Sequence, residues 1–188
     1  MKYFLTLVFA SLLFVSCSND TPKPYAYFRI DLPPHEYRTF DSIYPPCSFE
    51  VPASAQVINR KARDGKSEWI DIVYPSLNGR IYCNYSSINA NFRALSEDSR
   101  NLVYKHTVRA DAIIEHPFEN PEMKVYGILY EITGNAASPI QFIVTDSVHH
   151  FLRGSLYFNN TPNADSIAPV SAYVEDDIRH LVESVIWK

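Results

Sequence analysis

An apolar segment at the N-terminus decides which part of this chain has to fold as a domain. A single lysine is followed by an apolar run over residues 3–15, and the run ends at Ser16 and Cys17. A positive start, a short apolar run and a small residue before the processing point are the three parts of a secretory signal, and the run is too short to span a bilayer comfortably. We therefore expect residues 1–16 to be removed as a signal peptide.

The end of this segment resembles a bacterial lipobox, with the sequence Phe14-Val15-Ser16-Cys17. In lipoproteins with such a signal the cysteine thiol is acylated and the cysteine becomes the new N-terminus. Several acyl chains, at about 0.8 kcal/mol per buried CH₂, anchor a protein stably to a membrane that it does not span. Cys17 is thus the predicted lipidation site, and residues 17–24 form the lipidated end and its tether. An ordinary signal peptide cut nearby, or an uncleaved anchor, is the alternative.

The composition is typical of a globular domain and excludes several classes of protein. Apolar residues make up 46% and charged residues 20% of the chain, which excludes a disordered, collagen-like or coiled-coil protein. A formal net charge of −4 leaves no basic field to concentrate nucleic acid, so we expect no nucleic-acid partner. We predict a single globular domain over residues 25–188, and its proline-rich arm over residues 25–52 should run extended along a surface.

Alternating apolar residues predict strands, and the residues between them predict hairpin turns. One strand is expected over residues 69–74 and a second over 80–85, with Asn78-Gly79 supplying the positive φ that the turn needs. A meander of three strands is predicted further along the chain, over residues 125–132, 140–145 and 148–158.

Two helices complete the pattern. Residues 88–110 contain no glycine or proline and have apolar side chains at helical spacing, whereas 159–169 reads as a loop before a C-terminal helix. The order strands, helix, strands, helix predicts an α+β fold with a mainly antiparallel sheet, a central helical segment and a C-terminal helix. We expect both helices on one face of the sheet, in a layered sandwich comparable to the Mog1/PsbP type.

Two cysteines remain after lipidation of Cys17. Cys47 and Cys83 each have apolar residues two positions away along a predicted strand, which places both thiols on apolar strand faces. In an oxidising compartment they are candidates for a disulfide, worth roughly 4 kcal/mol in the chain-entropy model. Two buried free thiols that act as small apolar side chains are the alternative.

No set of polar residues has the spacing of a catalytic or metal site. Ser155, His150 and Asp146 suggest a hydrolase triad, but Ser155 and His150 have opposite parity on a predicted strand, so their side chains should leave opposite faces. His149 and His150 are neighbours in a strand and cannot bind one metal ion together. Helix capping and the helix dipole explain the acidic residues that suggest a calcium site, Asp165, Glu175, Asp176 and Asp177. We expect no catalytic residue, metal or cofactor.

An Asp-Ser-aliphatic pattern occurs three times and resembles the O-glycan acceptor signal of Bacteroidota envelope proteins. The candidate acceptors lie in predicted turns or loops and are Ser42, Ser147 and Ser166. Turn chemistry is the alternative, because Asp and Ser side chains both hydrogen-bond nearby backbone groups.

Motifs in order along nearly the whole mature chain are similar to those of the gliding motility lipoprotein GldD family, and the block from Gln141 to Phe158 is the most distinctive. The matching stretches include Pro22-Lys23-Pro24, Tyr74–Gly79, His106-Thr107, Val125–Gly127, Gln141–Ser147, Gly154–Phe158 and Asp177-Ile178. The resemblance implies an envelope lipoprotein required for gliding motility and type IX protein secretion, and it carries over no catalytic residue.

From this resemblance we expect a non-enzymatic lipoprotein that faces the periplasm and contacts other gliding and type IX secretion proteins. The residues that follow Cys17 leave the choice between the inner and the outer membrane open. The candidate contact residues are Tyr25, Tyr27, Arg29 and Tyr157. Two other functions stay open, namely an envelope hydrolase acting on peptidoglycan or glycan, and a periplasmic ligand-binding lipoprotein with an apolar pocket between sheet and helices.

Overall fold

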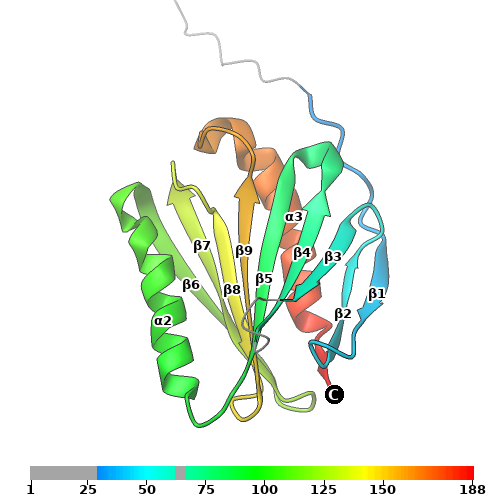
Figure 1. Ribbon diagram of the computed structural model, residues 1–188. Helices are drawn as coiled ribbons and strands as arrows, with labels where there is room; N and C mark the ends of the chain where they lie inside the picture. The colour runs from blue at the N-terminus through cyan, green and yellow to red at the C-terminus, as the bar shows by residue number, and fades with distance from the viewer. Residues whose placement is uncertain (1–28, 62–66) are drawn as a thin grey trace, which may run out of the picture.

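Two antiparallel sheets and two α-helices make up the part of the chain that the computed structural model describes, residues 29–61 and 67–188 (Figure 1). The larger sheet has the strand order β3-β4-β5-β9-β8-β7-β6, and all its neighbouring strands are antiparallel. In chain order these strands are β3 (Gln56–Lys61), β4 (Ser67–Tyr74), β5 (Gly79–Ser87), β6 (Ala110–Asn120), β7 (Val125–Gly134), β8 (Ile140–Thr145) and β9 (His150–Phe158). The predicted α+β fold with a mainly antiparallel sheet is confirmed.

The proline-rich arm contributes to a second, smaller sheet. Strands β1 (Tyr37–Asp41) and β2 (Cys47–Pro52) pair with each other, and β10 (Ile186–Trp187) adds to the other edge of β2. The expectation of an extended surface segment is therefore wrong for β2. Its alternate residues Cys47, Phe49 and Val51 are fully buried in the main core, because alternation of apolar residues places one face of a strand inward.

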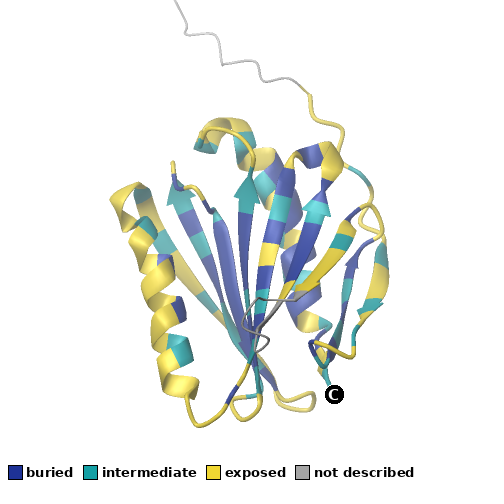
Figure 2. Cartoon of the chain, in the orientation of Figure 1, coloured by how far each residue is buried: buried dark blue, intermediate teal, exposed yellow. Residues whose placement is uncertain are grey.

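The two helices cover opposite faces of the larger sheet, whereas we expected them on one face. Figure 1 shows α3 (Ala164–Glu183) passing behind the sheet and α2 (Phe92–Tyr104) beside β6 and β7 on the viewer's side. Side chains of β7 alternate between the two layers: Leu129 packs in the core that contains α3, and Tyr130 packs in the core that contains Val103 of α2. Figure 2 shows the middle strands mostly buried and α2 mostly exposed. Two short 3₁₀ helices follow β4 and α2, namely η1 (Pro75–Leu77) and η2 (Lys105–Val108).

The C-terminal helix begins earlier than predicted. Asn163 is its N-cap, and the side-chain oxygen of Asn163 accepts the backbone N–H of Ser166 at 3.2 Å. The helix therefore includes Pro169, which the sequence placed in a loop. Pro169 is the sixth residue of the helix, so its ring removes the hydrogen bond that a backbone N–H at this position would donate to the carbonyl of Asp165.

Gly154 in β9 makes room for a core aromatic side chain. A Cβ atom at this position would lie 2.1 Å from the Phe142 ring of the neighbouring strand β8. A glycine inside a strand often marks the close approach of a ligand or of another backbone. The approaching group is instead a side chain of the same sheet, and it fills the main core.

Candidate functional site

Half of the larger sheet, on the face opposite α3, has no helix or strand of the described residues packed over it. The exposed side of this half is built from β3, β4, β5 and β9, and strand register arranges its side chains in three rows. The rows are Ile58-Asp71-Tyr82-Ser155, Arg60-Trp69-Asn84-Arg153 and Val73-Arg80-Tyr157. We call these residues the open face.

Large side chains of the open face are in contact with solvent. Trp69 is 47% exposed, Tyr82 43% and Ile58 41%. Helix α2 covers only the other half of the same face, where Val103 packs on Tyr130 and its neighbours. Trp, Tyr and Arg are the residue types enriched in protein interfaces, and here they stand together on one exposed face of the sheet. The open face thus has the composition of a docking surface.

A buried carboxylate holds the arginines of the open face in place. Asp71 is 1% exposed, and its Oδ2 accepts hydrogen bonds from Arg60 and, at 3.2 Å, from Arg80. The guanidinium carbon of Arg80 lies 5.5 Å from the centre of the Tyr82 ring, and Tyr82 meets Tyr157 edge to face with ring centres 5.7 Å apart. These contacts fix the charged and aromatic groups before any partner binds, which lowers the entropy lost on binding.

A hollow of about 500 Å³ adjoins the open face where β4 turns into β5. Arg80, Tyr82 and Tyr157 line one side of it, and Asn78 lies at the turn. Asn78 has a φ of 51° and donates its side-chain amide to Asn160 at 2.7 Å, so it supplies the predicted positive φ and ties this turn to the end of β9.

One of the four candidate contact residues lies on the open face. Tyr157 lines the hollow, whereas Tyr25 and Tyr27 lie outside the described residues. Arg29 is exposed and donates to Asp31 at 3.0 Å. The two arginines that bind Asp71 are not among the predicted contact residues, although the strand alternation around Trp69 already indicated an outward-facing side.

A second polar cluster, between α3 and the arm, was also missed. The Asp177 carboxylate is 1% exposed, and its Oδ1 lies 2.8 Å from His35 Nδ1 and accepts the Tyr37 hydroxyl at 3.0 Å. His35 stacks on Tyr173 with ring centres 4.3 Å apart. Burial raises the pKa of Asp177 above its ordinary value, and the hydrogen bonds from His35 and Tyr37 offset only part of that rise. His35 and Asp177 are 142 positions apart, so no local pattern brings them together.

The residues that suggest a hydrolase are separated by the sheet. Asp146 Oδ1 accepts the three backbone N–H groups of residues 148–150 and so closes the turn between β8 and β9. Although partial burial raises it, these hydrogen bonds bring the pKa of Asp146 below its ordinary value. Ser155 is buried on the other side of β9 from His150 and donates to Gln141 at 3.3 Å. The predicted opposite parity of His150 and Ser155 is consistent with this placement.

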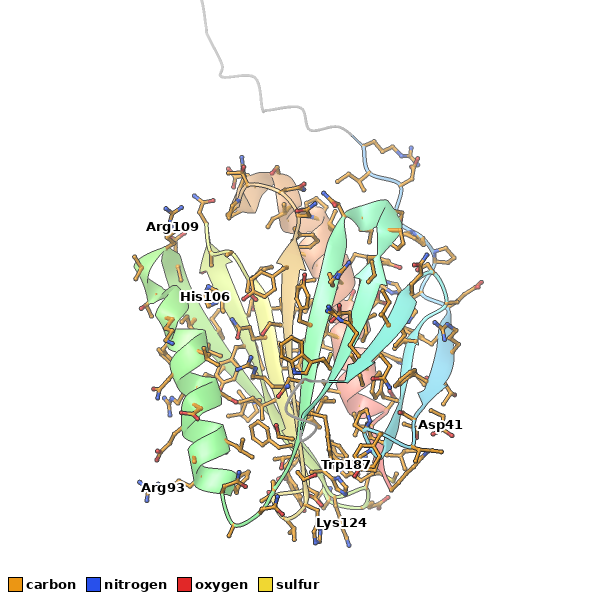
Figure 3. All side chains as sticks on the ribbon, in the orientation of Figure 1. Asp41, Arg93, His106, Arg109, Lys124 and Trp187 are labelled. Atoms are coloured by element: carbon orange, nitrogen blue, oxygen red, sulfur yellow. The ribbon has the colours of Figure 1, made fainter. Side chains whose placement is uncertain are left out.

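The histidines are also dispersed. His150 stacks on Trp187 with ring centres 5.0 Å apart, and its Nδ1 lies 2.8 Å from the Tyr85 hydroxyl oxygen. Figure 3 shows Trp187 beside Lys124 at one end of the sheet and His106 at the opposite end. Within residues 29–61 and 67–188, no group of three or more His, Cys, Asp or Glu side chains is placed to hold a metal ion.

The cysteine pair faces one apolar core. Cys47 on β2 and Cys83 on β5 are both buried there and are free thiols in the structure. Burial raises the pKa of Cys47 to about 12 and that of Cys83 still further, so both stay protonated and unreactive. The disulfide between Cys47 and Cys83 stays a prediction, and so does the free-thiol alternative.

The candidate glycan acceptors lie at the surface. Ser147 is exposed in the turn between β8 and β9, and Ser166 is exposed in the first turn of α3 rather than in the predicted loop. Ser42 is half-buried, and its hydroxyl donates to the Tyr44 carbonyl at 2.5 Å. This local bond of Ser42 is the expected turn chemistry. Glycosylation at Ser42, Ser147 and Ser166 stays a prediction.

The predicted lipidation site Cys17 lies outside the described residues. In the part of the chain that the structure describes, no helix combines the length and the apolar character needed to cross a membrane.

Comparisons with known proteins give one family and one similar structure. A family model described as gliding motility lipoprotein GldD matches residues 17–187. No curated protein matches the chain. The solution structure of cyanobacterial PsbP from Synechocystis sp. PCC 6803 is similar at a TM-score of 0.49 and 8% identity, over 84% of this chain and 95% of that chain. The family match includes the whole open face and the Asp177 cluster.

Proposed function

Because this chain belongs to the gliding motility lipoprotein GldD family, we propose that it supports gliding motility and type IX protein secretion by docking another envelope protein on its open face. Membership in a lipoprotein family associates the chain with an envelope membrane through a lipid anchor. The type IX role, the orientation toward the periplasm and the non-enzymatic mode of action are parts of the proposal. The family match starts at residue 17, the cysteine that the lipobox pattern predicts as the lipidated N-terminus.

The open face is the observation that carries this proposal. Trp69 and Tyr82 remain nearly half exposed on a rigid sheet, beside arginines that are already fixed by Asp71. Such aromatic and arginine anchors supply most of the binding energy in many protein interfaces. A lipid tether raises the effective concentration of this surface near other membrane-bound proteins, so a modest intrinsic affinity suffices for assembly.

An envelope hydrolase is less well supported by the described residues. Its catalytic groups would have to converge in one cleft within hydrogen-bond reach of a substrate. The Ser155 side chain is buried and bonded to Gln141, and Asp146 is occupied by backbone N–H groups of the β8–β9 turn. Full complementation of gliding by substitutions at His106, His149, His150 and Asp146 would exclude this alternative.

A ligand-binding lipoprotein is the second candidate, and one observation favours it. A groove of about 470 Å³ lies between α2 and the sheet, with Phe92, Tyr126 and Tyr130 among its lining residues. Its volume falls in the ordinary range of small-molecule sites, about 300–1,000 Å³. Filling it with Ile143→Trp distinguishes the two functions: loss of gliding in a folded variant supports a ligand, and unchanged gliding supports docking.

The docking proposal is tested by cross-linking the full-length lipoprotein in gliding cells. A photoreactive amino acid at position 82 or 157 should give a discrete covalent adduct with one envelope protein of the gliding or secretion machinery. The same amino acid at Leu102, which is 37% exposed on α2, is the matched control and should give none.

Alanine substitutions then connect the contact to function. Trp69→Ala and Tyr82→Ala should reduce adduct formation, gliding and type IX secretion together, because they remove anchor area from the open face. The melting temperature should fall only modestly, since nearly half of each side chain is exposed to solvent, and Leu102→Ala should leave all readouts unchanged. Normal gliding and secretion in the Trp69→Ala, Tyr82→Ala double variant would contradict the proposal.

A further inference from the structure

The open face carries an excess of positive charge on an acidic chain. Among its described residues, three arginines (Arg60, Arg80 and Arg153) face one carboxylate, that of Asp71. The whole chain has a formal net charge of −4. The positive field of this face is therefore local, and it favours a partner with negative charge.

The buried carboxylate positions the arginines and leaves their remaining donors available. Arg60 and Arg80 both donate to Asp71 Oδ2, and 48% and 38% of their respective side chains remain exposed. Each guanidinium has five N–H donors, so one bond to Asp71 leaves the others for a second acceptor. Asp71 is too deeply buried to meet a partner itself, which makes it a positioning residue for the two arginines.

Arg153 adds a third cationic group on the same face of the sheet, at the far end of the row that begins with Arg60. It follows Asn84 in the row that starts at Arg60 and Trp69, and it is partly buried. No ion pair within residues 29–61 and 67–188 neutralises it. Burial lowers the pKa of Arg153, as expected for a guanidinium that loses hydration without gaining a carboxylate. A carboxylate from a partner would supply the missing compensation.

We infer that the open face binds an acidic segment of a protein partner, whose carboxylates meet Arg60, Arg80 and Arg153 while its apolar side chains pack on Trp69 and Tyr82. This inference rests on the proposed docking function and names the chemistry of the partner. Planar guanidinium groups bind carboxylates through two parallel N–H donors, which gives geometric selectivity as well as attraction.

The apolar part of the face favours a polypeptide over an anionic polysaccharide. Ile58 is 41% exposed beside Asp71, and Val73 lies beside Arg80 in the third row. Aliphatic side chains of this kind pack on other apolar side chains, which an acidic peptide can carry between its carboxylates. A uniformly charged glycan offers no such groups to Ile58 and Val73.

The test measures binding of the mature lipoprotein in detergent to three defined probes. These are a synthetic peptide of alternating Glu and Val, the matching peptide of alternating Lys and Val, and polygalacturonate as a carboxylated glycan. We expect the Glu-Val peptide to bind best, the Lys-Val peptide not to bind, and the affinity for the Glu-Val peptide to fall as NaCl is raised.

Two substitutions locate the binding on the open face. Arg80→Gln should weaken Glu-Val peptide binding by about tenfold, because it removes a preorganised anchor. Arg153→Gln should weaken Glu-Val peptide binding as well. Because this variant keeps both arginines that bind Asp71, it shows whether weaker binding in Arg80→Gln comes from a folding defect. Arg93→Gln is the matched control, since Arg93 on α2 is 91% exposed and bonded only to Glu97 among the described residues.

The outcomes separate this inference from the proposed function. Equal peptide affinity in Arg153→Gln, Arg93→Gln and the unchanged protein overturns the inference, and so does tighter binding of polygalacturonate. If cross-linking from position 82 still captures a protein in those cases, docking on the open face stands and only the acidic partner is wrong. If position 82 gives no adduct in cells, the docking function fails regardless of peptide affinity.

Discussion

Among single residues, Asp177 has surroundings with a specific consequence for the pH dependence of stability. Its pKa is raised in the folded protein, chiefly by burial, so the native state holds the proton of this carboxyl more tightly than the unfolded chain does. Its contribution to the free energy of unfolding is therefore greatest below the unfolded pKa and is lost as pH rises through the folded pKa. The shift of Asp146 has the opposite sign, so its contribution is lost as pH falls through its lowered folded pKa.

The two aspartates should thus give opposite pH trends when each is replaced by asparagine. We expect the stability advantage of the unchanged protein over Asp177→Asn to grow as pH falls from neutral to about pH 4. Its advantage over Asp146→Asn should shrink only below about pH 4, as pH falls through the lowered folded pKa of Asp146. Urea unfolding at a series of pH values measures both differences. Parallel trends for the two variants would show that the Asp177 carboxylate is not desolvated as the structure has it.

Gly154 offers a second residue-scale prediction. Gly154→Ala should lower the free energy of unfolding by about 2–3 kcal/mol, because its new Cβ would lie 2.1 Å from a Phe142 ring that is itself fully buried. Gly79→Ala is the milder comparison, since the nearest atom there is a Phe158 ring carbon at 3.1 Å. Chemical denaturation measures both values, and equal losses would contradict the packing argument.

At the scale of secondary structure, the side chain of Asn163 caps the start of α3, where Asn135 also accepts the Ala164 backbone N–H at 3.0 Å. Asn163→Ala removes the acceptor for the Ser166 backbone N–H and should cost about 1 kcal/mol of stability. Asn163→Asp keeps an acceptor oxygen and should cost much less. Amide hydrogen exchange should show faster exchange in the first turn of the helix for Asn163→Ala, and unchanged protection there would refute the capping role.

Elements set by local patterns were predictable, and those set by distant contacts were not. The hairpin at Asn78 follows from its turn residues, and the alternation of Cys47 with Phe49 and Val51 correctly indicated an apolar strand face. Nothing local shows that β5 pairs with β9 or that the two helices lie on opposite faces, because these arrangements depend on how distant strands meet. The His35–Asp177 contact was missed for the same reason. The bonds of Arg60 and Arg80 to Asp71 cross neighbouring hairpin strands, so strand alternation could have indicated them.

At the scale of the whole molecule, the C-terminus joins the two sheets. Strand β10 pairs with β2 of the smaller sheet, while the Trp187 side chain stacks on His150 of the larger sheet and donates its Nε1–H to the Lys124 carbonyl at 3.2 Å. Lys188 adds an ion pair to Asp41 in the arm. Trp187 therefore links the smaller sheet, β9 and the start of β7, which are far apart in the sequence.

Trp187→Ala should consequently loosen the packing of one sheet against the other. We expect a loss of about 2 kcal/mol in the free energy of unfolding, below the 3–5 kcal/mol of a fully buried aromatic residue, because Trp187 is only half-buried. Ile186→Ala is the matched control, since Ile186 lies next to it in β10 but is 47% exposed and should cost little. Hydrogen exchange should rise in β1 and β2 more than in β5 and β9, because the larger sheet keeps its own strand pairs. A uniform rise across both sheets would mean that the two sheets unfold as one unit and that Trp187 stabilises the molecule as a whole.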